Sequence, residues 1–135
     1  MNKKVVVLSA TVVCIAVAVA LFFVIGRRVK LGDVNKAEIN YDYDSVLVDE
    51  SLTKEETETI TDIFENNFLY SDNPSCGFSQ DISIVIDNDK TFCIARDTCG
   101  IIYWKEKDKY FKVSDEDIEK VHKLFENHGG KFPCV

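Results

Sequence analysis

The sequence predicts an α+β protein: an N-terminal transmembrane helix followed by a small antiparallel sheet with two amphipathic helices packed on one face. Three observations support this fold class. A long uncharged apolar run opens the chain, several short segments alternate apolar and polar residues, and two later segments combine a helical period with capping signals. The expected element order after the membrane helix is ββα-ββββα.

The first element is the apolar segment 5–26, which contains no charged residue and is flanked by a pair of cations on each side. At about 1.5 Å of rise per residue this segment is roughly 33 Å long, which matches a hydrocarbon core of about 30 Å. We expect residues 1–28 to form an uncleaved signal anchor that contacts membrane lipid through 5–26. A cleaved signal peptide is the alternative, because residues 18–20 have the small-x-small form of a cleavage site.

Residues 29–36 are short and mixed in composition, so we expect a tether between the anchor and a domain formed by residues 37–135. That domain is acidic. All 23 Asp and Glu residues follow position 28, against 12 of the 16 Lys and Arg residues, which gives residues 29–135 a net charge of −11. Because such a surface is repelled by phosphate backbones, we expect no nucleic-acid partner.

The first strand is expected to begin near Ala37, where apolar and polar residues alternate, and a second short strand is expected at 46–48. The period then changes. Thr53 followed three residues later by Glu56 is a capping box, and the apolar residues after it fall on one helical face. This pattern predicts an amphipathic helix over about 54–67.

Four further strands are expected, separated by turn signals, at 81–87, 91–95, 100–104 and 110–113. The last element is the best specified. Ser114 is a suitable N-cap, the acidic residues after it complement the helix dipole, and the pair Gly129 and Gly130 ends the helix. We therefore expect a second amphipathic helix between these signals.

Four cysteines follow the membrane segment, namely Cys76, Cys93, Cys99 and Cys134. An even number in a small domain is typical of exported proteins. We therefore expect a single-pass cell-membrane protein with an extracytoplasmic head, although Lys and Arg are nearly balanced around the membrane segment. A hairpin over 93–99 would place Cys93 opposite Cys99 and leave Cys76 to bond Cys134. The other two pairings of four cysteines stay open.

The sequence gives little sign of catalysis. It contains no CxxC, and its two histidines, His122 and His128, lie six positions apart and so do not share a helix face as metal ligands would. No glycine-rich phosphate loop or nucleophile elbow is present. We expect no catalytic residue, metal or cofactor. The alternative is a thiol- or metal-dependent enzyme that uses the cysteines with His122 or His128.

Aromatic and acidic residues come together in the expected strands, where Tyr41, Tyr43 and Trp104 accompany Asp42 and Asp44. Such a face would suit a basic peptide or protein partner, because Trp and Tyr are common anchors in recognition surfaces. The alternative is that these aromatic residues belong to the core. The expected function is a membrane-anchored, disulfide-stabilised, extracytoplasmic binding or accessory module without catalytic activity. A structural subunit of a membrane complex is a further alternative.

Overall fold

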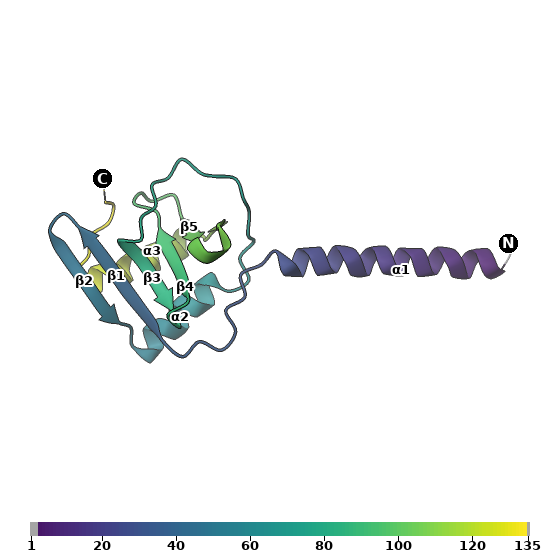
Figure 1. Ribbon diagram of the computed structural model, residues 1–135, viewed down its shortest axis with the longest axis horizontal. Helices are drawn as coiled ribbons and strands as arrows, with labels where there is room; N and C mark the ends of the chain where they lie inside the picture. Colours follow the sequence, from purple (N-terminus) through teal and green to yellow (C-terminus); the bar gives the residue numbers. More distant parts are fainter. Residues whose placement is uncertain (1–2, 135) are drawn as a thin grey trace.

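The computed structural model describes residues 3–134, which form three α-helices and a six-stranded antiparallel sheet (Figure 1). The predicted α+β class and N-terminal apolar helix are confirmed. The elements are α1 (Lys3–Gly26), β1 (Ala37–Tyr43), β2 (Val46–Ser51), α2 (Lys54–Phe64), β3 (Ile82–Ile86), β4 (Lys90–Ile94), β5 (Ile101–Trp104), the 3₁₀ turn η1 (Lys105–Lys107), β6 (Lys109–Lys112) and α3 (Asp115–Asn127).

Helix α1 projects away from the rest of the molecule (Figure 1). Its segment Val5–Gly26 is long and apolar enough to cross a membrane, and none of that segment is buried inside the protein. A signal sequence would satisfy the same criteria of length and composition. The exposed apolar surface therefore requires lipid or another apolar environment.

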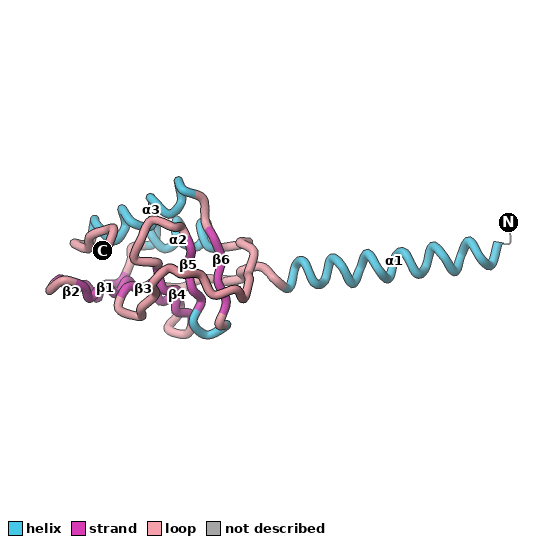
Figure 2. Tube along the Cα trace, turned by 90° about the horizontal axis from the view of Figure 1, so that it is seen from above, coloured by secondary structure: helices cyan, strands magenta, loops and turns pink. Residues whose placement is uncertain are grey.

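The strands follow the order β2-β1-β3-β4-β5-β6, and every neighbouring pair is antiparallel. Figure 2 shows that α1 leaves beyond the β6 end of this sheet, that β2 lies at the opposite end, and that α2 and α3 lie on one side of the strands. Because side chains alternate along a strand, every second residue points to the sheet face that α2 and α3 cover. Ile39, Ile84, Phe92 and Trp104 are in register across four strands, and all four are buried.

Helix α2 begins at the predicted capping box. The Thr53 hydroxyl accepts the Glu56 N–H at 3.2 Å, and the Glu56 carboxylate accepts the Thr53 N–H at 2.9 Å. The helix ends at Phe64, three residues earlier than predicted, because Asn66 adopts a left-handed conformation with a φ of 64°. That conformation turns the chain away from the helix axis and leaves its backbone available to another segment.

Helix α3 begins at the Ser114 cap and ends in a Schellman motif. The Gly130 N–H donates to the Phe125 carbonyl at 2.9 Å, and the Gly129 N–H donates to the Glu126 carbonyl at 3.0 Å. Gly129 has a φ of 101°, a conformation that a side chain would strain. The two glycines therefore fix the C-terminal end of the helix as the sequence predicts.

The segment expected to be a tether, 29–36, is packed against the rest of the protein. Val29 and Leu31 are buried in the core. The backbone of Val29 pairs with the turn after α2, since its N–H donates to the Asn67 carbonyl at 2.9 Å and its carbonyl accepts the Asn66 N–H at 3.0 Å. The folded domain therefore begins at Val29, with only Arg27 and Arg28 between it and the end of α1 at Gly26, and we call residues 29–134 the head.

Candidate functional site

One pair of cysteines meets in the head. Cys76 lies in the long loop between α2 and β3, Cys99 lies in the connection between β4 and β5, and their sulfur atoms are 2.6 Å apart. Asp97 completes a cluster of potential metal ligands, because its carboxylate accepts the Cys99 N–H at 3.0 Å. Among residues 3–134 this is the one group of three such side chains, with all ligand atoms within 4.8 Å of one another.

The electrostatics of this cluster favour a pair of thiols over a thiolate. Burial, together with hydrogen bonds to Asp97 and Cys76, raises the pKa of Cys99 to about 12. The hydrogen bonds that Cys99 donates lower the pKa of the Asp97 carboxyl. A protonated thiol is a weak nucleophile, and metal binding would require its proton to be displaced. The arrangement is suited to disulfide formation, in which both thiol protons and two electrons pass to the disulfide of an oxidant.

This geometry differs from the expected pairing of Cys93 with Cys99. Strand β4 ends at Ile94, so Cys99 falls in the loop rather than in the facing strand, and Cys93 lies opposite Tyr103. Cys93 is buried, and this burial raises the pKa of its thiol to about 11. The loop position instead brings Cys99 to Cys76.

The fourth cysteine does not lie with Cys76 as the expected second pairing requires. Cys134 is buried near the C-terminal end, where its thiol donates to the Lys131 carbonyl at 3.1 Å and contacts the Tyr41 hydroxyl at 3.6 Å. Burial raises the pKa of this thiol as well. Cys134 therefore takes part in packing beneath the sheet end, where a protonated thiol behaves as a small apolar group.

The two histidines have structural partners. His122 is buried on α3 and stacks on Phe132, with ring centroids 4.2 Å apart, and burial lowers its pKa. His128 follows α3 and lies between two carboxylates, with Nδ1 2.5 Å from Glu50 and Nε2 3.1 Å from Glu56. Within residues 3–134 no hydrogen bond joins a histidine to a cysteine.

Two residues of the expected partner surface lie in the core. Tyr41 is 1% exposed and Trp104 is 5% exposed, because both fall on the strand phase that faces the helices. The Tyr41 hydroxyl donates to the Lys131 carbonyl at 2.8 Å, which satisfies its polar end. These two side chains are therefore unavailable to a protein partner on an open surface, and the expected acidic and aromatic face is not a continuous one.

The remaining members of that surface lie on and beside the first hairpin. Asp42 and Asp44 are exposed, and Tyr43 is half-buried with the Arg96 guanidinium 5.6 Å from its ring centroid. Asp44 and Ser45 both have positive φ values, 51° and 65°, and form a two-residue hairpin turn. The carboxylates are thus retained at the surface, whereas Tyr41 and Trp104 are buried and Tyr43 is only partly exposed.

The acidic hairpin, which we define as residues 37–51, also exposes a large apolar side chain that the sequence reading missed. Leu47 is 76% exposed and lies opposite Asp42, on the face that the helices leave open. Asp49 follows on the same face, opposite Asn40. The period of two along residues 46–49 could have indicated this exposure, because Val46 and Val48 face the helices and Leu47, between them, must point to the other face.

Among the described residues 3–134, strand β2 lies at an edge of the sheet and pairs only with β1. Tyr43 and Val46 flank the two-residue turn, a position where paired residues exchange both backbone hydrogen bonds. Because antiparallel pairing alternates, the N–H groups of Leu47 and Asp49 point away from β1. The outer edge of β2 therefore presents unpaired backbone donors and acceptors beside acidic side chains.

No family model, curated protein or solved structure matches this chain.

Proposed function

We propose that this chain is a membrane-anchored binding module, without catalytic activity of its own, that presents the acidic hairpin to a basic, extended segment of a partner protein outside the cytoplasmic membrane. A single observation carries the proposal. The sheet runs from the α1 end of the head at β6 to an acidic edge strand, β2, at its far end. With strands about 4.8 Å apart, β2 lies roughly 25 Å from β6.

The anchoring part of the proposal rests on α1 and on the thiol pair. An exposed apolar helix of this length is stable in a bilayer and unfavourable in water. Proximity of Cys76 and Cys99 supports an oxidising compartment, because a disulfide there would tie the long loop before β3 to the sheet. The helix supports anchoring but not a side of the membrane, whereas the thiol pair favours an extracytoplasmic head.

The chemistry of the β2 edge identifies the class of partner. An incoming extended peptide can pair with the outward backbone groups of β2, and its side chains would then alternate between the two faces. On the open face they would meet Asp49 beside Leu47, and on the other face they would meet Val46 and Val48, which suits a peptide whose basic residues alternate with apolar ones. The same carboxylates disfavour pairing with a second copy of β2, because like charges would face each other.

A binding measurement tests the partner class. The full chain in phosphatidylcholine nanodiscs is titrated with a labelled peptide of alternating Lys and Val, and we expect saturable binding. Leu47→Pro removes an outward N–H without removing a bond to β1, and should weaken binding about tenfold relative to the control Leu47→Ala. Equal affinity of these two variants would exclude strand addition at β2.

The role of charge is tested separately with Asp42→Asn/Asp49→Asn. Exposed ion pairs contribute up to about 1 kcal/mol each, so this variant should weaken the peptide several-fold and reduce the salt dependence of binding. Asp115→Asn/Glu116→Gln, which removes two charges from the start of α3, is the matched control. A similar loss in both variants would show that net charge, and not the acidic hairpin, attracts the peptide.

Membrane anchoring and orientation are tested in cells that express the full chain. We expect it to remain in the membrane pellet after alkaline carbonate extraction, and we expect protease added to intact cells or spheroplasts to digest the head. Release by carbonate would overturn the anchor. A head that is protected until the membrane is permeabilised would place it in the cytoplasm and overturn the extracytoplasmic assignment.

A further inference from the structure

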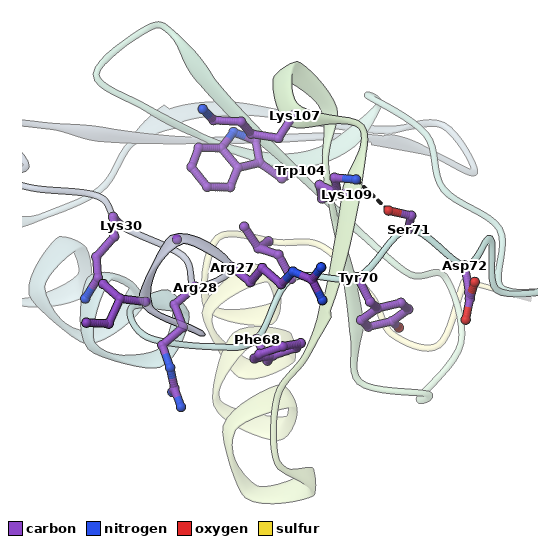
Figure 3. A pocket seen from close by; sticks show the side chains of 13 residues that line it. Arg27, Arg28, Lys30, Phe68, Tyr70, Ser71, Asp72, Trp104, Lys107 and Lys109 are labelled. Carbon is purple, nitrogen blue, oxygen red and sulfur yellow. Dashed lines mark hydrogen bonds between the residues drawn. The ribbon is translucent and has the colours of Figure 1, made fainter. Parts of the chain in front are cut away.

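A cavity of about 650 Å³ lies where α1 meets the head. Its walls come from segments far apart in the sequence: Arg27 directly after α1, Phe68 and Tyr70 in the loop after α2, and Trp104 and Lys107 at the end of β5 and in the turn that follows it. Figure 3 shows Arg27 between the Trp104 wall and the Phe68 wall. The fold therefore builds this cavity at the point where the chain would leave a membrane.

The cavity is basic although the head is strongly acidic. Five cations line it, Arg27, Arg28, Lys30, Lys107 and Lys109, against the single carboxylate of Asp72. The net charge of the lining is thus +4, whereas residues 29–135 carry −11. Such local reversal of charge marks a site suited to an anion.

Two of the five cations have structural partners. Arg28 donates to the Asn66 carbonyl at 2.8 Å, and Lys30 donates to the Asn66 side chain at 2.5 Å and lies 3.7 Å from Glu65. These contacts fix the segment after α1 to the end of α2.

The other three cations are not held by carboxylates. Among residues 3–134, no ion pair involves Arg27, Lys107 or Lys109. Lys109 donates to the neutral Ser71 hydroxyl at 2.5 Å. Lys107 lies over the Trp104 ring, 5.6 Å from its centroid. Three cations therefore remain available to neutralise a ligand.

The apolar part of the lining suits the boundary of a bilayer. Phe68 is 48% exposed, and Ile25 at the end of α1 borders the same cavity. Trp104 is nearly buried, and its indole N–H has no hydrogen-bond acceptor within residues 3–134. Aromatic side chains concentrate at membrane–water interfaces, where one end is apolar and the other meets polar groups. Cations, aromatic rings and the end of α1 thus converge on one cavity, which would lie at headgroup depth when α1 spans a bilayer.

We propose that this cavity receives the phosphate headgroup of an anionic phospholipid from the leaflet in which α1 ends. The inference rests on the proposed membrane anchoring and goes beyond it. Arg27, Lys107 and Lys109 neutralise the phosphodiester, and Phe68 contacts the upper part of the acyl chains. The bound lipid joins the head to the bilayer next to β6 and so fixes the direction in which the sheet leaves the membrane.

Lipid selectivity of the full chain tests this inference. The protein is reconstituted in nanodiscs of equal parts phosphatidylcholine and phosphatidylglycerol, and co-purifying lipid is counted by native mass spectrometry. We expect retained phosphatidylglycerol to exceed retained phosphatidylcholine. In Lys107→Gln/Lys109→Gln this enrichment should fall about fivefold for each charge removed. The matched control Lys112→Gln/Lys131→Gln, at residues that do not line the cavity, should keep it.

Trp104 provides a second readout, because it is the sole tryptophan of the chain and lines the cavity. Its fluorescence should change when phosphatidylglycerol replaces part of the phosphatidylcholine, and should not change in Lys107→Gln/Lys109→Gln. Soluble glycerol phosphate added to the chain in phosphatidylcholine nanodiscs should have no effect. A saturable response to it would identify a free phosphate ester as the ligand and overturn the lipid assignment.

The outcomes separate this inference from the proposed function. A chain that stays inserted in pure phosphatidylcholine but shows no preference for phosphatidylglycerol overturns the lipid site and leaves the anchor intact. Equal loss of enrichment in the control variant also overturns the site, because it would show that general charge attraction is sufficient. A chain that does not insert into either bilayer overturns both proposals.

Discussion

Cys99 lies in a connection rather than in a strand, and this position decides which cysteine it meets. In the β4–β5 register Cys93 lies opposite Tyr103, so a hairpin four residues shorter would be needed for Cys99 to face Cys93. Instead Asp97 accepts the backbone N–H of Cys99 in a local turn, and this turn directs the thiol toward Cys76. A shift of a few residues in the loop thus changes the connectivity that sequence spacing suggests.

We predict that Cys76 and Cys99 are bonded in protein isolated from its native membrane. Alkylation of the denatured, unreduced chain should label Cys14, Cys93 and Cys134 but neither member of the pair. On the chain-entropy model a loop of this length contributes about 3 kcal/mol, so Cys76→Ser should lower the free energy of unfolding by about that amount. Labelling of all five cysteines without reduction would contradict the bond.

His128 connects three elements, since it follows α3, contacts Glu50 on β2 and contacts Glu56 on α2. The hydrogen bond to Glu50 is the largest cause that raises the pKa of His128 above its ordinary value. A pKa raised in the folded state means that protonation favours folding. The resulting stability is fully present below the ordinary histidine pKa of about 6.5 and is lost as the pH rises through the raised value.

His128→Gln should therefore destabilise the head by about 1 kcal/mol near pH 6, a modest value because Glu50 is mostly exposed. The difference from the parent protein should shrink as the pH rises above the raised pKa of His128. Urea unfolding at about pH 6 and about pH 9 measures both values. A loss of stability that is the same at both pH values would show that the ring contributes by packing and not by charge.

The elements of the head differ in how much of each can be read from its own sequence. Both amphipathic helices have local signals at their starts, and the Schellman glycines of α3 fix its end. The end of α2 is set by a distant segment, because Asn66 pairs with Val29 rather than continuing the helix. The same limit applies to the candidate sites, since the cavity beside α1 and the Cys76–Cys99 pair both join segments far apart in the sequence.

Strand faces show a second limit. Alternation correctly places aromatic residues in strands, but it does not say which phase the helices cover. Tyr41 and Trp104 fall on the covered phase, whereas Leu47 falls on the open one. Deciding between the phases requires the register of all six strands and the position of both helices, and that information is spread over the whole head.

The segment 29–36 contributes to the stability of the head through its buried side chains. A fragment of residues 29–135 should be more stable than one of residues 37–135, because the shorter fragment loses Val29 and Leu31 from the core and leaves the end of α2 unpaired. Burial of two such side chains contributes about 3 to 5 kcal/mol. Urea unfolding of both fragments measures the difference. Equal stabilities would show that residues 29–36 act as a free tether.

Charge is distributed along the whole molecule in one direction. Acidic residues dominate the hairpin at the β2 end, and the cations of the cavity gather at the α1 end. An anionic bilayer attracts the second group and repels the first, so the two effects act together to orient the head. Helix α1 is needed to hold the basic cavity against the bilayer. Without it, the net negative charge of the head determines the interaction with an anionic membrane, which is then repulsive.

We therefore predict that a fragment of residues 27–135, which contains all five cavity cations but lacks α1, does not float with phosphatidylglycerol vesicles at physiological salt. Repulsion of the acidic head should exceed the attraction of a small basic region when the fragment is free to rotate. Flotation of the same fragment with vesicles of a cationic lipid is the positive control. Flotation with phosphatidylglycerol would show that the cavity holds the membrane unaided.

The backbone of Val29 pairs with the turn after α2, so only Arg27 and Arg28 connect α1 to the head. A rotation of α1 about its own axis should therefore rotate the head by the same angle. If two copies associate through α1, the contact between the two helices also fixes the orientation of their β2 strands and the distance between them. The lipid-embedded contact would then determine how far apart two docked peptides stand.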